Sequence, residues 1–421
     1  MPTLTPRKNP PPWRYRILLR VVSPILFGYT LWKTFKGGGS RYLRERLGFY
    51  YVAIPERQTN SQLLWVHAAS VGEVITVLPL VRSWLATVEN RQVLFTTGTP
   101  TGYEVLDNQD IPGITHQYLP IDFPGACRRF FRQANISQGW IVETEIWPWL
   151  YSRCHQAGVK LTIINGRLSD KTSKQSTGFL ASSYHRAICN IRILARTSED
   201  AKRFISLGAK ADNVTIAGDL KYATSSALSD IEPFIKHPFV LAASTHADEE
   251  LRIADAWRLI ENNNVLMVIA PRHPERGIIV YNDLVKKGFR VALRSIDQSP
   301  SATHEIFIVD TLGELPLLYQ YALAAFVGGS LIERGGHNVI EPAQFACPTV
   351  VGLHTLNFSD MVARLENNDA IKVARSATEV VDFLARASEG SSAHKDMGKR
   401  AQAVANADRQ DTLESYQNLL Y

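Results

Sequence analysis

The chain alternates short apolar runs with longer segments of helical periodicity from residue 61 onward. The apolar runs are rich in β-branched and aromatic residues and are bounded by turn-forming residues, which is typical of parallel strands buried on both faces. A first series of such runs predicts strands at 63–69, 92–98, 116–121, 139–145, 160–166, 192–197 and 214–218. A second series predicts strands at 239–245, 265–271, 290–294, 305–310, 323–329 and 349–353.

The segments between the runs are long enough for crossover helices, so each series predicts a doubly wound, Rossmann-like parallel sheet with helices on both faces. The stretch between the two series is polar and contains proline, as interdomain linkers do. We therefore expect an α/β protein with an N-terminal segment at 1–45, a first domain at 46–222, a linker at 223–238 and a second domain at 239–421. Because no GxGxxG motif follows the first strand, this pattern favours a two-lobed enzyme with a central cleft over a dehydrogenase.

Composition narrows the class of protein. The 421 residues are 45% hydrophobic and 20% charged, an ordinary globular balance. The four cysteines form no CxxC pair and no HExxH motif occurs, so we expect neither a disulfide framework nor a zinc site. The net charge is +6, but residues 1–60 hold eleven Lys and Arg against two Glu, which leaves the remainder slightly acidic. A basic end on a near-neutral body is not the pattern of a nucleic-acid enzyme, whose basic residues line the working cleft.

The basic N-terminal region contains an apolar stretch, VVSPILFGYTLW, at 21–32. Its twelve residues include Pro24 and fall short of the roughly 20 that span a bilayer. No small-residue cleavage site follows, which argues against a cleaved signal peptide. Apolar and aromatic residues flanked by Arg20 and Lys33 predict an interfacial anchor on an anionic membrane. The alternative is a helix that packs on the body of the protein and exposes a basic face.

Charged residues follow several predicted strands of the first domain, at the edge where open α/β sheets bind ligands. Glu73 follows the first strand in HAASVGEV, and Lys221 follows the last in GDLKYA. Glu143 and Glu145, in ETEIWPWL, would share one face of an extended segment. Glu73 suits a general base, although a helix-start carboxylate stabilised by the helix dipole is an alternative. The two later acids could equally form structural ion pairs, and Lys221 could be a solvated surface residue.

The second domain carries features that suit an anionic ligand. Arg272, in APRHPER, is placed to bind an anion by bidentate contacts, or is a loop arginine without a ligand. Gly313, in TLGEL, lets the backbone approach a ligand or serves a tight turn. Asn338, in GGSLIERGGHNVIEPAQF, is a good N-cap for a helix that begins with Val339 and Ile340. Free N–H groups at such a helix start bind anions.

Glu341 lies three residues after Asn338 and has two interpretations. It could close a capping box by accepting a hydrogen bond from the backbone N–H of Asn338. Alternatively, its carboxylate could bind the vicinal hydroxyls of a ribose. With an arginine, two glycine turns and a capped helix start, the second domain predicts a nucleotide phosphate site that has no Walker lysine.

The motifs of both halves resemble one family. The chain carries, in this order, HAASVGE, TTGTPTGYE, YLPIDFPG, ETEIWP, INGRLS, RTSEDAKRFISLGA, GDLKYA, STHADEE, PRHPER, DTLGEL, FVGGSLIERGGHNVIEPA and HTLNFSD. Together they resemble the 3-deoxy-D-manno-octulosonic acid (Kdo) transferases of lipopolysaccharide synthesis, over roughly residues 40–420. The resemblance implies a two-domain GT-B glycosyltransferase at the cytoplasmic face of the bacterial inner membrane. It also implies inverting transfer of Kdo from CMP-Kdo to a glucosamine hydroxyl of the tetraacyl lipid A precursor, without a metal or other cofactor.

The resemblance assigns roles to residues in the matching motifs. Glu73 would be the base that deprotonates the acceptor hydroxyl, and Glu143 and Lys221 would stabilise the transition state. The CMP site would comprise Pro271, Arg272, Leu312, Gly313, Glu314, Asn338, Val339, Ile340 and Glu341. Leu312 departs from the Met that is frequent in the family, a swap that conserves volume.

Two other functions fit the predicted fold. One is a UDP-sugar 2-epimerase of GT-B fold, which has no use for a basic amphipathic N-terminus. The other is a catalytically inactive membrane-bound scaffold, which has no reason to keep Glu73, Glu143, Lys221 and Arg272 together.

Overall fold

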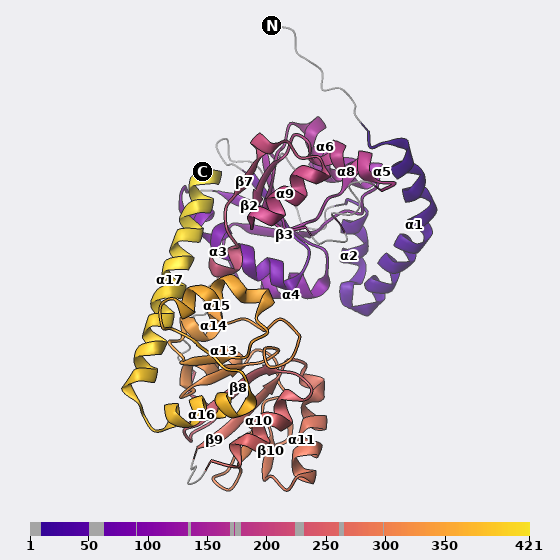
Figure 1. Ribbon diagram of the computed structural model, residues 1–421. Coiled ribbons are helices and arrows are strands. Elements are labelled where there is room, and N and C mark those ends of the chain that lie inside the picture. Colours follow the sequence, from indigo (N-terminus) through magenta and orange to yellow (C-terminus); the bar gives the residue numbers. More distant parts are fainter. Residues whose placement is uncertain are drawn as a thin grey trace, which may run out of the picture. The chain divides into compact units, whose positions relative to one another are not determined.

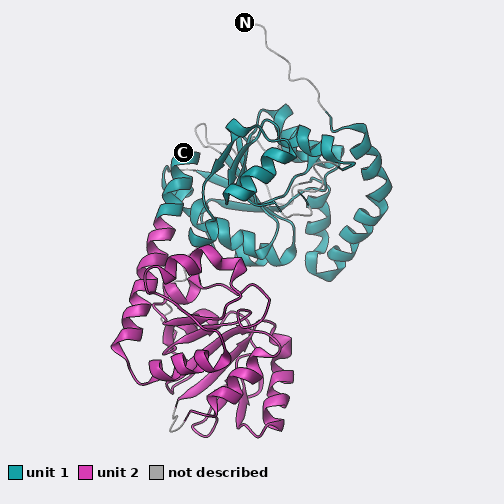
Figure 2. Cartoon of the chain, viewed as in Figure 1, with its two compact units in different colours: residues 1–224, 411–421 teal, residues 225–410 magenta. Residues whose placement is uncertain are grey.

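The structure is a computed structural model that describes residues 10–49, 63–89, 91–133, 136–168, 172, 178–223, 231–260, 265–297 and 299–421. These residues form two compact units (Figure 2). Unit 1 falls within 1–224 and 411–421, and unit 2 within 225–410. Each unit contains a seven-stranded parallel sheet in the described part of the chain.

The sheet of unit 1 has the strand order β3-β2-β1-β4-β5-β6-β7. Its strands are β1 (Leu63–Ala68), β2 (Gln92–Thr97), β3 (Ile114–Tyr118), β4 (Gln138–Val142), β5 (Lys160–Gly166), β6 (Arg192–Ala195) and β7 (Val214–Ile216). All seven strands predicted for the first domain are confirmed. Central strands such as β1 are buried almost throughout, which is why they read as continuous apolar runs.

Alternate residues of β1 enter two different cores, so both faces of the unit 1 sheet are covered. Leu64 and Val66 pack with α3 (Val71–Ala86), α4 (Pro100–Asp107) and the end of α17 (Ser392–Leu420). Trp65 belongs to the core on the opposite face. The helices that pack there are α5 (Pro124–Gln133), α6 (Pro148–Ala157), α8 (Ala181–Ile188) and α9 (Ser198–Leu207) (Figure 1).

Unit 2 repeats this design with the strand order β10-β11-β9-β8-β12-β13-β14. Its strands are β8 (Phe239–Thr245), β9 (Leu266–Pro271), β10 (Val291–Leu293), β11 (Ile306–Ile308), β12 (Ala325–Val327), β13 (Thr349–Val351) and β14 (Lys372–Val373). The six predicted strands are confirmed. The seventh, β14, was not predicted, because its two residues are at the sheet edge and only partly buried, which gives them no apolar run.

The helices of unit 2 also cover both faces of its sheet. Val240 and Ala242 of β8 pack on one face, whereas Leu241 and Ala243 pack on the other. The first core takes side chains from α10 (Glu249–Trp257), α11 (Gly277–Lys286) and α16 (Ala377–Ser388). The second takes them from α13 (Leu315–Tyr321) and from the segment after α14 (Ile340–Gln344). Helices α12 (Arg294–Asp297) and α15 (Ser359–Glu366) complete the unit.

The last helix corrects the predicted domain boundary. We expected the second domain to run to residue 421, but residues 411–421, the end of α17, belong to unit 1. The reason is the buried side chain of Tyr416, whose hydroxyl accepts a hydrogen bond from Asn165 N at 3.1 Å and donates one to Gly218 O at 3.0 Å. At the predicted linker, residues 224–230 lie outside the described part of the chain, and residues 231–238 count with unit 2.

The predicted N-terminal segment is helical and packs on unit 1. It comprises α1 (Trp13–Lys33), a π-helical turn (Thr34–Gly38) and α2 (Gly39–Arg46), whereas residues 1–9 lie outside the described residues. Tyr15 of α1 donates a 2.5 Å hydrogen bond to the buried carboxylate of Asp122. In α2, the buried Glu45 accepts a hydrogen bond from Tyr118 N at 2.8 Å. None of the described helices is both long and apolar enough to cross a membrane.

Candidate active site

In each sheet the strands that follow the first strand lie on one side of it and the later strands lie on the other side, which creates a topological switch point beside the first strand. In unit 1 this switch point lies between β1 and β4, and in unit 2 it lies between β8 and β12. Open α/β sheets bind ligands just beyond the carboxyl ends of the strands at such a point. Glu73 follows β1 and Glu143 follows β4, so the fold brings these two predicted site residues to the switch point of unit 1.

Glu73 lies in the first turn of α3, and its carboxylate accepts hydrogen bonds from the residues just before the helix. Its Oε2 accepts a hydrogen bond from Ala69 N at 2.8 Å, and its Oε1 accepts one from Ser70 Oγ at 3.0 Å. Ser70, the N-cap, in turn accepts a hydrogen bond from Glu73 N. Burial raises the pKa of Glu73 to about 7, and the nearby charges of Glu143 and Glu145 add to this rise. The carboxylate therefore has a structural role and a pKa suited to a general base at neutral pH.

The segment after β4 differs from the predicted extended segment. Glu143 adopts a φ of +60°, a left-handed conformation that ends the strand at Val142, and its N–H donates to Ile164 O at 2.9 Å. The Glu145 carboxylate accepts a hydrogen bond from Trp147 Nε1 at 2.7 Å. The two acids thus do not share one face of a strand. Burial raises the pKa of each carboxyl.

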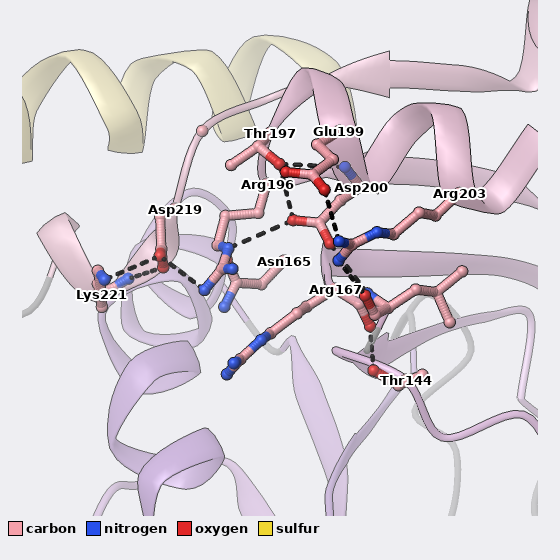
Figure 3. Close-up of polar contacts among 12 residues, drawn as sticks. Thr144, Asn165, Arg167, Arg196, Thr197, Glu199, Asp200, Arg203, Asp219 and Lys221 are labelled. Carbon is pink, nitrogen blue, oxygen red and sulfur yellow. Dashed lines mark hydrogen bonds and ion pairs between the residues drawn. The ribbon is translucent and has the colours of Figure 1, made fainter. Parts of the chain in front are cut away.

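Lys221 belongs to a network of charged side chains at the carboxyl ends of β5 to β7 (Figure 3). Its Nζ lies 3.4 Å from the Asp219 carboxylate, which also accepts a hydrogen bond from Arg196 Nη1 at 3.3 Å. Burial lowers the pKa of Lys221, the Asp219 charge raises it, and the Arg196 charge lowers it. The charges of Arg167 and Arg196 also counter the burial that raises the pKa of Glu143. Lys221 and Glu143 are therefore members of one electrostatic cluster.

Arg272 follows β9, at the same edge of the unit 2 sheet as the switch point. Pro271, the last residue of β9, lies in register with Thr245, and Arg272 N donates a hydrogen bond to Thr245 O at 2.9 Å. The Arg272 side chain is exposed, whereas its neighbour Arg276 is bound to the buried Glu250 carboxylate at 2.7 Å. Of the two arginines, Arg272 therefore has the more accessible side chain.

The three residues predicted to contact CMP at 312–314 differ in their surroundings. Leu312 is 83% exposed, and Gly313 has a φ of +85° with open space around its Cα. Glu314, in contrast, is bound by Arg294, whose Nη2 lies 2.7 Å from its carboxylate. Burial acts to raise the pKa of Glu314, but the hydrogen bonds from Arg294 and Thr311 outweigh it and lower the pKa. At this turn, the backbone of Gly313 is more available to a ligand than the side chain of Glu314.

The helix predicted after Asn338 is shorter than expected. It is the five-residue α14, and Val339 rather than Asn338 occupies its N-cap position. Asn338 Oδ1 accepts a hydrogen bond from Ile340 N at 3.0 Å. The capping box predicted for Glu341 does not form, because its carboxylate bonds to no described residue, the Asn338 N–H included. Burial raises the pKa of Glu341 to about 6.

Glu249 was missed by the sequence analysis and organises the unit 2 switch point. This fully buried carboxylate accepts hydrogen bonds from Gly329 N at 2.8 Å, Ser330 N at 3.2 Å and Leu331 N at 3.1 Å. It also accepts one from His246 N at 3.0 Å. An acidic residue in the first turn after a strand was the available signal, but the same pattern occurs at ordinary helix starts.

The described residues contain no group of three or more His, Cys, Asp or Glu side chains arranged to hold a metal ion. The expectation that the reaction needs no metal or cofactor stays a prediction.

Two Rossmann-like units, each with polar groups at the switch point of a parallel sheet, define a GT-B protein. The crystal structure of a glycosyltransferase from Rickettsia africae ESF-5 has this fold, with a TM-score of 0.58 at 11% identity over 86% of this chain and 97% of that one. The predicted fold class is confirmed.

Sequence relatives identify the family. The family described as "3-Deoxy-D-manno-octulosonic-acid transferase (kdotransferase)" matches residues 41–224. The chain is 32% identical to the 3-deoxy-D-manno-octulosonic acid transferase of Haemophilus influenzae, over 88% of this chain and 89% of that protein. It is 30% identical to that of Bordetella pertussis, over 82% and 84% of the two chains. The chain belongs to the Kdo transferase family. It is a glycosyltransferase that transfers Kdo, as the motifs predicted, and not the alternative epimerase.

Proposed function

We propose that this enzyme transfers Kdo from CMP-Kdo to a glucosamine hydroxyl of the tetraacyl lipid A precursor, in lipopolysaccharide synthesis. The acceptor oxygen attacks the anomeric carbon of Kdo and forms the new glycosidic bond. The bond from that carbon to the phosphate oxygen breaks, and CMP leaves as a phosphate monoester. The acceptor hydroxyl proton passes to the enzyme. A single displacement of this kind inverts the anomeric configuration and needs one base.

Glu73 is the proposed base, and its environment is the observation that carries the proposal. Its pKa of about 7 leaves a large fraction of the carboxyl ionised at neutral pH, yet basic enough to take a proton from a hydroxyl in the transition state. Ala69 N and Ser70 Oγ fix the position of both carboxylate oxygens. A base held in this way loses little freedom when the acceptor binds.

Glu143 and Lys221 are the proposed stabilisers of the transition state. Lys221 is partly buried, so its charge acts in a medium of lower dielectric constant than water. Glu143 carries the opposite charge and suits the positive character that develops at the anomeric carbon as the phosphate leaves. The salt bridge from Lys221 to Asp219 holds the ammonium group in place before the substrate arrives.

The proposed donor site lies in unit 2. Arg272 would bind an anionic group of CMP-Kdo, which carries a phosphate and the Kdo carboxylate. The carboxyl of Glu341 suits the ribose hydroxyls, with Asn338, Val339 and Ile340 in the same turn. Pro271, Leu312, Gly313 and Glu314 complete the proposed set. We propose no metal for the leaving group, since positively charged side chains are available to bind the phosphate.

Helix α1 supports a membrane-bound location, which we propose to be the cytoplasmic face of the bacterial inner membrane. One side of α1 packs on unit 1 through Tyr15 and Leu19. The apolar residues Ile17, Val21 and Ile25, spaced four apart, are each about half or more exposed. An apolar stripe with basic flanking residues suits insertion into the interface of an anionic membrane, where the enzyme would meet its glycolipid acceptor.

A product assay tests the proposal. The full-length enzyme is incubated in detergent with the lipid A precursor and a system that generates CMP-Kdo. The mass of the glycolipid product is then determined by mass spectrometry. We expect a mass increase of one or more Kdo residues. If the wild-type enzyme adds no sugar to this acceptor but does so to another, the acceptor assignment is wrong. If CMP-Kdo is not consumed with any acceptor, the donor assignment is wrong.

A further inference from the structure

Two histidines meet at the switch point of unit 2, and no role was predicted for either. His246 is the first residue after β8, and His337 lies in the loop after β12, the neighbouring strand. Their rings stack with centroids 5.0 Å apart and an interplanar angle of 17°, and their Nε2 atoms are 2.7 Å apart. That distance requires a proton between the two nitrogens, so one ring donates and the other accepts.

The backbone around the pair is built to keep the rings in contact. The Glu249 carboxylate binds the N–H groups of both His246 and Gly329, and so ties the loop after β8 to the loop after β12. Gly329 has a φ of +67°, and a Cβ at this position would lie 3.1 Å from His337 Nε2. The loop closes through a 2.8 Å hydrogen bond from Gly336 N to Gly329 O. The position of the pair thus depends on a buried carboxylate and on a glycine.

Arginine side chains face the pair, although the carboxylate of Glu249 binds His246 N and that of Glu250 pairs with Arg276. The groups that face His246 are Arg334, His273, Arg276 and Arg272, and His337 faces His246, Arg272 and His273. Burial lowers the pKa of both imidazoles, and these charges lower it further, to about 4 for His337. Both rings are only partly buried, so they remain accessible to a ligand. In the absence of a ligand the pair is therefore neutral at pH 7.

We propose that the His246–His337 pair binds the phosphate of CMP and takes up one proton as it does so. This inference rests on the proposed donor. In the neutral pair, the donating ring has its only proton on Nε2 and a lone pair on Nδ1. One added proton occupies that Nδ1 without breaking the Nε2–H···Nε2 bond. Both rings then present an N–H at Nδ1, and the pair carries one positive charge.

The bound anion supplies the driving force for the proton uptake. A phosphate beside Arg272 offsets the positive charges that lower the pKa of the pair, and a hydrogen bond to the anion favours the imidazolium form. The proton taken up by the pair also favours the transfer reaction, because it adds a positive charge beside the leaving group. When the bond from Kdo to phosphate breaks, the leaving CMP gains negative charge, and the protonated pair donates hydrogen bonds to it. The pair is a binding and stabilising group here, whereas the acceptor proton goes to Glu73.

Calorimetry measures the proton directly. CMP is titrated into the full-length enzyme at pH 7.5 in buffers with different ionisation enthalpies, and the dependence of the observed heat on the buffer gives the number of protons exchanged. We expect the wild type to take up a measurable fraction of a proton. His246→Gln and His337→Gln should each reduce that number to near zero and weaken CMP binding at least about tenfold, the loss expected for one charge-assisted hydrogen bond. Each variant should bind CMP with less dependence on pH than the wild type does.

His237→Gln is the matched control, because His237 is exposed and lies just before β8, at the opposite end of that strand. It should keep both the proton uptake and the affinity of the wild type. Equal thermal unfolding midpoints for all three variants would exclude a general loss of folding. Proton uptake that persists in both site variants would assign the proton to the phosphate itself and overturn the inference. CMP binding without proton exchange would overturn this inference alone, whereas a wild type that binds no CMP would also contradict the proposed donor.

Discussion

The carboxylate of Glu249 accepts a hydrogen bond from the N–H of Gly329 at 2.8 Å, although 80 residues separate them in the chain. The contact joins the start of α10 to the loop after β12, the two segments that border the switch point of unit 2. Glu249 is fully buried and its carboxylate is bound by backbone N–H groups. The proposed donor site therefore depends on a residue that is not itself exposed to a ligand.

Replacement of this carboxylate should loosen the glycine-rich loop. Glu249→Ala leaves the N–H groups of Gly329, Ser330 and Leu331 without their acceptor, at a cost of at least about 3 kcal/mol. Hydrogen exchange followed by mass spectrometry should show lost protection in the peptide that covers 328–340. Glu366→Ala, at an exposed helix end in the same unit, should leave that peptide unchanged. Equal protection in the two variants would contradict the role given to Glu249.

The reaction should depend on pH through Glu73. Its pKa is raised to about 7, and the active form of a base is the deprotonated one, so kcat/KM should fall about tenfold for each pH unit below that value. Glu73→Gln should reduce kcat at least about 100-fold while the amide oxygen keeps the cap of α3. Glu104→Gln, an exposed residue of α4, is the control and should keep wild-type activity. A Glu73→Gln enzyme with the wild-type rate would refute the base assignment.

Lys221 should affect the chemical step more than the fold. Lys221→Met keeps much of the side-chain volume but removes the charge near Asp219, and we expect kcat to fall about 100-fold, as for one electrostatic donor. The KM for CMP-Kdo should change less than kcat, because the interaction strengthens in the transition state. Lys202→Met, on the exposed side of α9, is the matched control. A change confined to KM would indicate ground-state binding only.

The C-terminal helix should stabilise unit 1 through one hydroxyl. Tyr416→Phe removes the hydrogen bonds to Asn165 N and Gly218 O at a buried position, and should cost about 1–3 kcal/mol in the free energy of unfolding. Tyr421→Phe removes a hydroxyl whose bonds to Leu80 O and Ser83 Oγ are 3.2 and 3.5 Å long, and should cost less. Urea unfolding monitored by circular dichroism compares the two. The reverse order of stability would show that the Tyr416 hydroxyl does not anchor α17.

Membrane binding should depend on the exposed stripe of α1. Ile25 is 70% exposed, so Ile25→Asp should leave the fold intact while it weakens binding to vesicles that contain anionic lipid. Ile205→Asp places the same change at an exposed position of α9 and should have no effect on binding. Vesicle co-sedimentation at low and high salt separates the apolar contribution to membrane binding from the electrostatic one, because salt screens only the contribution of the basic residues. Equal sedimentation of the two variants would contradict the anchor.

The sequence by itself determined the strands and the class of fold. Strands such as β1 and β9 are buried on both faces, so burial leaves an unbroken apolar run that can be recognised without the structure. The motifs and their order were also sufficient to determine the family. Each motif is a local pattern of residues that can be recognised without the structure. The short edge strand β14 was not predicted from the sequence, because its partial burial leaves no unbroken apolar run.

Tertiary structure alone decided which of these local elements meet. The positive φ of Glu143, the anchoring of Tyr416 and the contact between His246 and His337 are each imposed by groups that are distant in sequence. No residue type encodes them, because the same Glu, Tyr or His would occupy other conformations in another packing environment. The sequence placed polar groups at the ends of strands, and only the packed sheets brought them within hydrogen-bonding distance.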